Sequence, residues 1–198
     1  MNVVFDLGGV VFTWRPRQII EHVFKDSDIQ ERIRSEIFAH PDWEKLDRGV
    51  LDNEEAIERG ARRTGVSRSK IGELIKSFPH SLTPIKDTVK LIHAVKRSGN
   101  KIFALSNMHL SIIEHIEREY SFWDIFDGMV ISCRVRMVKP EEEIFKYLLD
   151  EYGLMVEETI FIDDTELNVN TALRLGFRTI QFDNPSQCED ELRSIGCL

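Results

Sequence analysis

Short apolar runs alternate with longer amphipathic stretches along most of this chain, and this alternation predicts its elements. Residues 2–7 form an apolar run rich in β-branched side chains that stops at Gly8-Gly9, which is typical of a buried strand before a tight turn. From residue 84 onward the pattern predicts helices over 84–98, 110–120, 140–152 and 166–175, and strands over 102–105, 129–132, 159–162 and 179–182. Strands that alternate with helices in this way indicate a doubly wound parallel α/β sheet.

The segment 14–82 differs from the rest, because its pattern is helical and polar-rich and contains no convincing strand. Asp26-Ser27 and Asn53 are typical helix starts, Gly65 is a helix stop, and Ser67 precedes apolar residues at helical spacing. The first strand lies before this segment and the others lie after it. We therefore expect one α/β core of residues 1–13 and 83–198, with a small α-helical unit of residues 14–82 inserted into it.

Polar residues lie beside the carboxyl ends of four predicted strands, the edge at which open parallel sheets bind ligands. These residues are Asp6, Ser106-Asn107, Lys139 and Asp163-Asp164. Each one alone is also typical of a helix N-cap or a solvated loop. Together they supply an anionic nucleophile, a carboxylate pair for a hard divalent cation, and donors with one positive charge for an anion. Phosphoryl transfer needs this combination, because the transferred group repels an anionic nucleophile unless positive charge offsets it.

The same residues resemble, in order, the four motifs of the haloacid dehalogenase-like hydrolases. The motifs are Asp6-Leu7-Gly8-Gly9-Val10-Val11, Ser106-Asn107, Lys139-Pro140, and Ile162-Asp163-Asp164-Thr165 with Asn168. The resemblance spans essentially the whole chain, and the inserted unit lies where part of the family carries a helical cap. It is strongest toward bacterial phosphatases of sugar phosphates such as α-glucose 1-phosphate, and toward the phosphatase-like N-terminal domain of soluble epoxide hydrolases. It implies a Rossmann-like core and a Mg²⁺-dependent phosphatase acting on a small phosphorylated metabolite, with a sugar phosphate as the expected substrate.

The resemblance also implies roles for the residues that handle the phosphoryl group. Asp6 would attack phosphorus and form an aspartyl-phosphate, which water then hydrolyses. Ser106 and the main chain of Asn107 would bind the phosphoryl oxygens. Lys139 would pair with Asp6 and with the phosphate.

The implied metal ligands come from the first and last motifs. Asp6, Asp164 and the main-chain carbonyl of Gly8 would bind Mg²⁺. Asp163 would either bind the ion through a water molecule or steady the motif lysine. Asn168 lies one turn into the following helix, where it either hydrogen-bonds the metal loop or faces solvent.

Gly8 is also where the chain departs from the family pattern. Most phosphatases of the family have a second aspartate there, which protonates the leaving group and later activates water, and such help is typically worth about 10²–10⁴-fold in rate. Sugar-phosphate phosphatases with glycine at this position exist, so the departure does not imply inactivity. Three explanations stay open. The substrate has a leaving group that needs little protonation, another acid such as His109 or a residue of the helical unit supplies the proton, or the enzyme turns over slowly. For His109 itself, an exposed residue at a helix start is the simpler interpretation.

Two other functions stay open at this point. A 2-haloacid dehalogenase uses the same aspartate to displace halide from carbon and also lacks the second aspartate, but it needs no metal and lacks the acidic pair that Asp163-Asp164 forms here. A catalytically weak binding or regulatory protein would keep the fold without the chemistry. The intact Asp6, Lys139 and Asp164 argue against that alternative.

Aromatic side chains are concentrated in and beside the helical unit. Trp14, Phe38 and Trp43 either contact the part of the substrate beyond the phosphate or form the core of the unit, and the second arrangement is the more common one.

Composition and charge limit the classes of binding partner and the cellular location that we expect. The 198 residues include 26 Lys and Arg against 34 Asp and Glu, a formal net charge of −8 without a Lys/Arg run, which argues against a nucleic-acid partner. The apolar N-terminal run is interrupted by Asp6 and has no basic flank, so neither a signal peptide nor a membrane span is expected. Three widely spaced cysteines suit a reducing compartment, and we expect a cytoplasmic protein. The six histidines contain no H-x-x-x-H pair that would indicate zinc.

Overall fold

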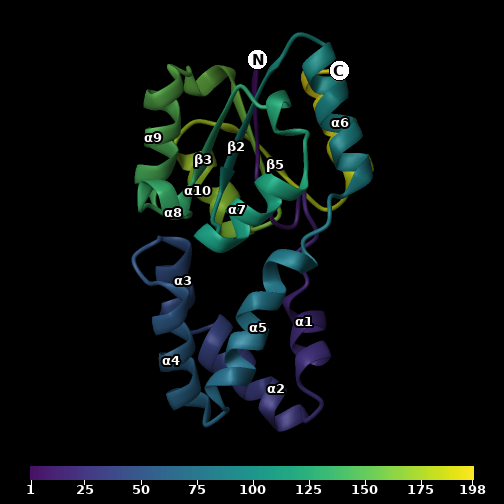
Figure 1. Ribbon diagram of the computed structural model, residues 1–198. Helices are drawn as coiled ribbons and strands as arrows, with labels where there is room; N and C mark the ends of the chain where they lie inside the picture. The colour runs from purple at the N-terminus through teal and green to yellow at the C-terminus, as the bar shows by residue number, and fades with distance from the viewer.

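A five-stranded parallel sheet forms the centre of one half of the molecule in the computed structural model, which describes residues 1–198 (Figure 1). The strands are β1 (Asn2–Phe5), β2 (Lys101–Ser106), β3 (Gly128–Ile131), β4 (Thr159–Asp163) and β5 (Arg178–Gln181), in the order β3-β2-β1-β4-β5. The first strand is therefore central, with Val3 paired to Ile102 of β2 and to Ile160 of β4. The carboxyl ends of β1, β2 and β4 meet at one edge, and the residues that follow them converge there.

Helices cover both faces of this sheet, because successive strand side chains point to opposite sides. Val3 and Phe5 pack with α6 (Lys86–Arg97), α7 (Leu110–Glu119) and α11 (Pro185–Ile195) in one apolar core. Val4 and Phe161 pack with α9 (Glu142–Tyr152) and α10 (Glu166–Arg174) in a second core on the other face. This arrangement confirms the predicted doubly wound α/β fold. Short segments α8 (Ser132–Val135), Trp123–Ile125 and Val156–Glu158 complete the core.

Helix α11 has no counterpart in the sequence prediction. Its start carries a recognisable signal, since Asn184 caps it by accepting a hydrogen bond from the main chain of Gln187 at 3.0 Å, and Pro185 occupies its first position. Only Cys188 and Leu192 of this helix are buried. The apolar period is therefore too sparse to indicate a helix.

The residues between the first two strands form a separate helical bundle, seen below the sheet in Figure 1. Its elements are α1 (Pro16–Val23), α2 (Ser27–Ile33), a π-helical turn (Arg34–Phe38), α3 (Pro41–Asp47), α4 (Asn53–Thr64) and α5 (Arg68–Ser81). The predicted boundaries hold here: Asp26 caps α2 through the main-chain nitrogens of Asp28 and Ile29, and Gly65 ends α4 with a left-handed φ of 69°. Helices α1 and α3 begin at proline residues and were not expected.

Two chain segments join the bundle to the sheet, and they are hydrogen-bonded to each other. The main-chain nitrogen of Thr13 donates to the carbonyl of Thr83 at 2.9 Å, and the nitrogen of Ile85 donates to the carbonyl of Val11 at 2.8 Å. The bundle thus enters and leaves the core at one narrow neck just beyond β1.

A second contact between the two parts lies at the end of α3. Arg48 forms two hydrogen bonds to the carboxylate of Glu141, at 2.8 and 2.6 Å, and the hydroxyl of Ser132 donates to the main-chain carbonyl of Asp47 at 2.5 Å. The bundle is therefore attached at both sides of the sheet edge. It covers the carboxyl ends of the strands, and a cavity is enclosed beneath it.

Within the bundle, Asp42 is a buried carboxylate held by three cations. It is 4% exposed and accepts hydrogen bonds from Arg63 at 2.6 Å, from Arg59 at 3.1 Å and from Lys45 at 3.2 Å. Burial by itself raises the pKa of Asp42, but the hydrogen bonds from Arg63 and Lys45 outweigh it and lower the pKa to about 2.

Replacing Asp42 by asparagine should therefore lower the free energy of unfolding by about 2 kcal/mol at neutral pH. A carboxylate with a lowered pKa stabilises the fold above its unfolded value of 3.8, and this contribution is lost as the pH falls toward about 2. Urea unfolding across that range should show the parent and the variant converging, while Asp28→Asn at an exposed position changes little. A difference that stays constant with pH would contradict this account.

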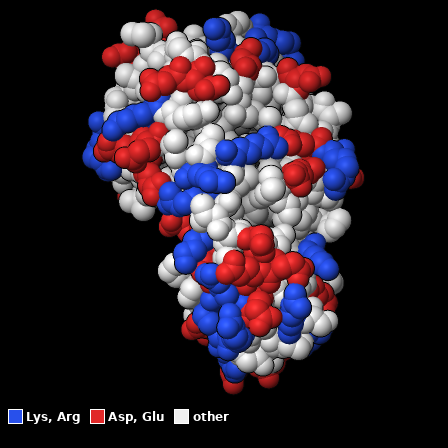
Figure 2. All heavy atoms as spheres, turned by 60° about the vertical axis from the view of Figure 1, so that its left-hand side comes forward, with Lys and Arg blue, Asp and Glu red and all other residues white.

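Charged side chains of both signs are intermingled on the face shown in Figure 2, over the core and the bundle alike. The charge of −8 is thus not concentrated in one patch on this face. No helix combines the length and the apolar character that a membrane crossing requires.

Candidate active site

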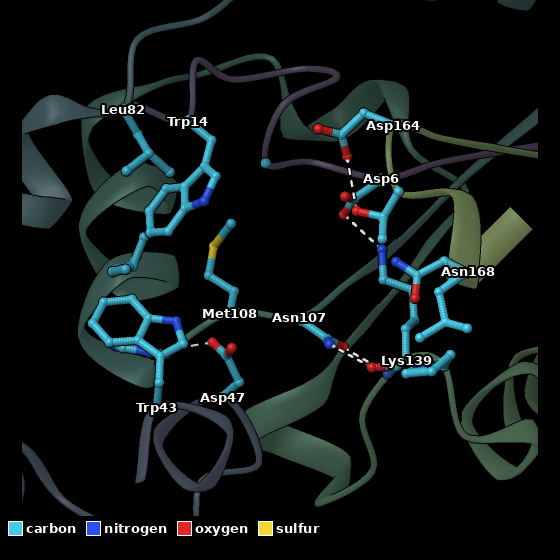
Figure 3. A pocket seen from close by; sticks show the side chains of 16 residues that line it. Asp6, Trp14, Trp43, Asp47, Leu82, Asn107, Met108, Lys139, Asp164 and Asn168 are labelled. Atoms are coloured by element: carbon cyan, nitrogen blue, oxygen red, sulfur yellow. Dashed lines mark hydrogen bonds and ion pairs between the residues drawn. The ribbon is translucent and has the colours of Figure 1, made fainter. Parts of the chain in front are cut away.

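A cavity of about 310 Å³ lies between the carboxyl ends of the strands and the helical bundle. Figure 3 shows that its two ends differ in character. One end is polar and is lined by Asp6, Gly8, Asn107, Lys139, Asp164, Thr165 and Asn168. The other end carries the large side chains of Trp14, Trp43, Leu82 and Met108, with Asp47 beside them. A volume of this size with few polar groups at one end is typical of a small-molecule site.

Asp6 lies at the polar end, directly after the central strand. Its main-chain nitrogen continues the sheet by donating to the carbonyl of Ile162 at 2.9 Å, and its side chain is turned by a hydrogen bond from the nitrogen of Leu7 to Oδ1 at 2.7 Å. The residue is 7% exposed. Burial raises the pKa of Asp6 to about 7, although the charge of Lys139 opposes the shift. A further cation near this carboxylate would favour its ionised form.

Lys139 connects two of the predicted site residues. Its Nζ lies 2.9 Å from Oδ1 of Asp6 and 2.6 Å from Oδ2 of Asp163, and its side chain is 1% exposed. Burial alone lowers the pKa of Lys139, but the charges of Asp163 and Asp6 reverse this and raise it. The lysine is therefore a fixed positive charge beside the nucleophile candidate, where its ammonium group also lies 5.6 Å from the centre of the Phe161 ring.

Ser106 ends β2 and Asn107 follows it, and the two side chains have different surroundings. The Asn107 side chain makes two hydrogen bonds to the main chain of Lys139, donating to its carbonyl and accepting from its nitrogen, each at 2.8 Å. It therefore holds the lysine loop, and only its main chain is left for a ligand. Ser106 is fully buried behind the cavity wall, and its hydroxyl has no hydrogen-bond partner in the protein.

Asp163 ends β4, and protein donors engage both of its oxygens. Oδ1 accepts from the nitrogen of Thr165 at 2.8 Å, Oδ2 accepts from Lys139 at 2.6 Å, and Nδ2 of Asn168 lies 3.1 Å from both oxygens. Of the two interpretations of Asp163, the one in which it steadies Lys139 matches this geometry. Asn168 is buried and faces the loop rather than solvent.

The cluster of Asp6, Asp163 and Asp164 has the composition of a site for a hard divalent cation. Each residue offers a carboxylate oxygen, and these oxygens lie within 4.8 Å of one another. Burial and the charge of Asp163 raise the pKa of Asp164, so a cation would relieve the concentration of negative charge. Oxygen ligands are what Mg²⁺ prefers, and Asp6 and Asp164 have oxygens that no strong protein donor occupies.

The glycine pair after Asp6 has a structural reason at each position. Gly9 has a φ of +83°, which favours glycine, and a Cβ there would lie 2.3 Å from the carboxylate of Asp164 and displace that side chain. A Cβ at Gly8 would meet nothing within 4 Å, and Gly8 lines the cavity. The position of the family's second aspartate thus has room for a side chain that this chain does not provide.

The structure corrects the interpretation of His109 and adds Asp47 to the site. His109 is 3% exposed rather than solvent-facing, because the bundle covers the start of α7 and places Trp43 against the imidazole with ring centres 4.4 Å apart. Its Nε2 lies 3.2 Å from Oδ1 of Asp47, and both residues line the cavity. Asp47 ends helix α3 without any motif around it, so nothing in the sequence singles it out.

The aromatic residues of the bundle form its core, which is the more common of the two expected arrangements. Trp14, Phe38, Trp43 and Phe78 pack on one another, with ring centres between 4.4 and 6.1 Å apart, and thereby form an aromatic core. Trp14 and Trp43 also line the cavity, whereas Phe38 does not.

Known proteins share both the sequence pattern and the fold. The chain is 27% identical over 195 residues to a sesquiterpene phosphatase of Aspergillus oryzae, covering 98% of this chain and 96% of that protein. It is 24% identical over 207 residues to a D-ribitol-5-phosphate phosphatase of Bacteroides thetaiotaomicron, covering 98% and 97%. A crystal structure of a haloacid dehalogenase family enzyme from Bacteroides thetaiotaomicron, in complex with magnesium and inorganic phosphate, matches with a TM-score of 0.71 at 28% identity, covering 92% of this chain and 93% of that one.

The family assignment rests on a match over most of the chain. The family model described as haloacid dehalogenase-like hydrolase matches residues 4–182, which include all four motifs and the helical bundle. The resemblance in the sequence is thereby confirmed, and this protein is an enzyme that belongs to the haloacid dehalogenase-like hydrolases.

Proposed function

We propose that this hydrolase is a Mg²⁺-dependent phosphatase that cleaves a small phosphate monoester through an aspartyl-phosphate. The observation that carries the proposal is the arrangement of Lys139 between Asp6 and Asp163 at the polar end of the cavity, with the open carboxylate of Asp164 beside it. Two relatives that match over nearly their whole length are named as phosphatases, which supports the same reaction.

In this reaction Asp6 attacks phosphorus while the fixed charge of Lys139 offsets the negative charge of the phosphoryl group. The main chain of Asn107 is a donor for a phosphoryl oxygen, since Asn107 lines the cavity. The Ser106 hydroxyl lacks a protein partner and lies beside Asn107, but it is fully buried outside the cavity lining, so it contacts a phosphoryl oxygen only after the wall moves. Water then hydrolyses the aspartyl-phosphate and releases inorganic phosphate.

The metal would be held by Asp6, Asp164 and the carbonyl of Gly8. When bound, Mg²⁺ supplies positive charge that favours ionised Asp6 and neutralises phosphoryl oxygens. Asp163 acts through Lys139, because its oxygens are already occupied by protein donors.

The organic part of the substrate would lie at the apolar end of the cavity. A sugar phosphate remains a candidate, and the relative named for D-ribitol 5-phosphate supports it. However, apart from Asp47 and His109 this end offers few groups for sugar hydroxyls, because Trp14, Trp43 and Leu82 are largely apolar, and the relative named as a sesquiterpene phosphatase supports an apolar ester. We place the apolar phosphate monoester first for this reason.

Residues 14–82 would serve as the cap that selects this substrate and excludes water, since the bundle supplies Trp14, Trp43 and Asp47 to the cavity. We keep the cytoplasm as the proposed location. All three cysteines are free, which suits a reducing compartment.

Haloacid dehalogenation and binding without turnover are the alternatives. The geometry favours neither alternative. Halide displacement without a metal does not need the acidic cluster, and a protein that only binds would not need the contact between Asp6 and Lys139. Halide release from 2-chloropropionate tests the first alternative directly.

Phosphate release from a panel of esters, measured with Mg²⁺ and with chelator, tests the proposed function. The panel contains a prenyl monophosphate, a hexose phosphate, a pentitol phosphate and 4-nitrophenyl phosphate. We expect release that depends on Mg²⁺, fastest for the prenyl ester, and a loss of at least about 100-fold with chelator. Release that is equally fast with chelator would contradict the metal requirement, and no release from any ester would contradict the phosphatase.

A further inference from the structure

The cavity lacks an acid at the position where the family usually carries one. Cleavage of an alkyl phosphate ester produces an alkoxide unless a proton reaches the leaving oxygen, and general acid catalysis is typically worth about 10²–10⁴-fold. Gly8 has no side chain to supply that proton, although the space around it is free within 4 Å of an added Cβ. Lys139 is occupied by two carboxylates, and Asp164 is a metal-ligand candidate. A proton donor for the leaving oxygen therefore has to lie elsewhere in the cavity.

Asp47 is a carboxyl group on the opposite wall of the same cavity. Figure 3 shows Asp47 across the cavity from Asp6 and Asp164, between Trp43 and the polar end. Its side chain is 16% exposed and contacts Nε2 of His109 at 3.2 Å. That nitrogen is buried and has no hydrogen bond of good geometry, so a polar atom at the wall is left without a partner.

The position of Asp47 is set by contacts that do not use its carboxyl group. Its main-chain carbonyl accepts from Ser132, whose hydroxyl oxygen in turn accepts from the nitrogen of Met108 at 2.9 Å. The neighbouring Arg48 is fixed to Glu141, two residues after Lys139 in the sequence. The carboxyl group is thereby held at the cavity wall, with Oδ1 against His109 and Oδ2 open to a ligand.

The surroundings of Asp47 favour the protonated form of its carboxyl group. Burial raises the pKa of Asp47 to about 8, and the charge of Asp6 adds to the shift. Burial lowers the pKa of His109 to about 3, so the imidazole is neutral and does not ionise Asp47. The titratable and charged groups that influence or contact Asp47 are Asp6, Glu44, His109, Cys133 and Lys139.

We propose that Asp47, supported by His109, is the general acid and base of this enzyme and replaces the aspartate absent at Gly8. As the bond between Asp6 and phosphorus forms, the bond from phosphorus to the leaving oxygen breaks, and the Asp47 proton moves to that oxygen to release the alcohol. The Asp47 carboxylate then takes a proton from the water that attacks the aspartyl-phosphate. Phosphate leaves, and Asp6 and protonated Asp47 are regenerated. This inference rests on the proposed phosphatase function.

The test compares Asp47→Asn with the parent on two esters that differ in leaving group. For the alkyl ester, kcat/KM should fall about 100-fold, because the alcohol is expelled without a proton. For 4-nitrophenyl phosphate, kcat/KM should fall less than about 10-fold, since this leaving group needs little protonation. Hydrolysis of the aspartyl-phosphate loses its base, so a burst of 4-nitrophenol should precede slow turnover. Equal losses on both esters, or none, would overturn the assignment.

Two further variants separate chemistry from structure. Glu58→Gln removes an exposed carboxylate of the same helical bundle, outside the cavity, and should leave both esters unaffected. Adding Gly8→Asp to Asp47→Asn places an acid in the free space near Asp6, and should restore kcat/KM for the alkyl ester to within about 10-fold of the parent. A double variant that stays as slow as Asp47→Asn would count against loss of a proton donor as the cause.

A stability measurement tests the protonation state without any turnover. A buried carboxyl group with a raised pKa binds its proton more tightly in the folded state, so it makes the metal-free protein less stable as the pH rises from about 4 to about 8. Asp47→Asn should remove part of this decline in urea unfolding with chelator present. Parallel declines would show that Asp47 is ionised and overturn its role as an acid. A parent that releases no phosphate from either ester would instead overturn the proposed function itself.

Discussion

Replacing Asp6 by asparagine should abolish phosphate release while leaving the fold intact. Asparagine has nearly the same shape, but its amide cannot attack phosphorus, and removing the nucleophile eliminates the covalent route. Lys139 keeps its contact with Asp163 in this variant, so the lysine loop stays in place. Residual turnover above about a hundredth of the parent rate would contradict the nucleophile assignment.

Acid-quenched mass spectrometry gives a direct measurement for the same variant. The parent should carry a phosphoryl adduct on the peptide that contains Asp6 during turnover, and Asp6→Asn should carry none. Asp183→Asn is the matched control, because Asp183 also follows a strand of the sheet but lies at the surface outside the cavity. This control should keep both the adduct and the parent rate.

The second large effect is expected at Lys139. Replacing it by methionine removes the only cation between Asp6 and Asp163 and leaves two buried carboxylates facing each other. Removing one partner of a buried ion pair typically costs about 3–5 kcal/mol, and loss of a preorganised charge at a reacting group costs about 10²–10³-fold in rate. Urea unfolding and phosphate release measure the two effects, and Lys146→Met, at an exposed lysine on α9, should produce neither.

A double variant separates the stability effect from the catalytic one. Adding Asp163→Asn to Lys139→Met removes a carboxylate that the first change left uncompensated, so much of the lost unfolding free energy should return. Turnover should stay low, because no positive charge faces the phosphoryl group. Recovery of turnover together with stability would mean that Lys139 acts only by holding the fold.

The fold and the polar end of the site could be predicted because both depend on local patterns. A buried strand needs a continuous apolar run, and the carboxyl ends of parallel strands share one edge. Asp6, Ser106, Asp163 and Asp164 each lie at or directly after such an end, and Lys139 lies in the loop region between β3 and α9. The topology of a parallel sheet is therefore sufficient to predict that they lie together. Helix α11 was not predicted, because only two of its residues are buried and it therefore has no clear apolar period.

The different roles of these residues depend on hydrogen bonds, which the spacing of the residues in the sequence does not reveal. The side-chain amide of Asn107 donates to and accepts from the main chain of Lys139. The carboxylate of Asp163 accepts hydrogen bonds from Lys139, Thr165 and Asn168. Asp164, next in sequence, is the carboxylate left open. Adjacent aspartates thus differ in role because one side chain points into the core and the next points into the cavity.

Local periodicity and the positions of strand ends were enough to predict the parallel sheet, the inserted helical unit and the motif residues. Only the tertiary structure decided that Asp47, His109, Trp14 and Trp43 share the cavity with Asp6. The bundle docks through contacts that include the Thr13–Thr83 neck, the Arg48–Glu141 pair and the hydrogen bond from Asn53 to Ser111, which join residues 70, 93 and 58 positions apart. Contacts between residues so far apart leave no period in the chain, because they depend on how two separately folded parts meet.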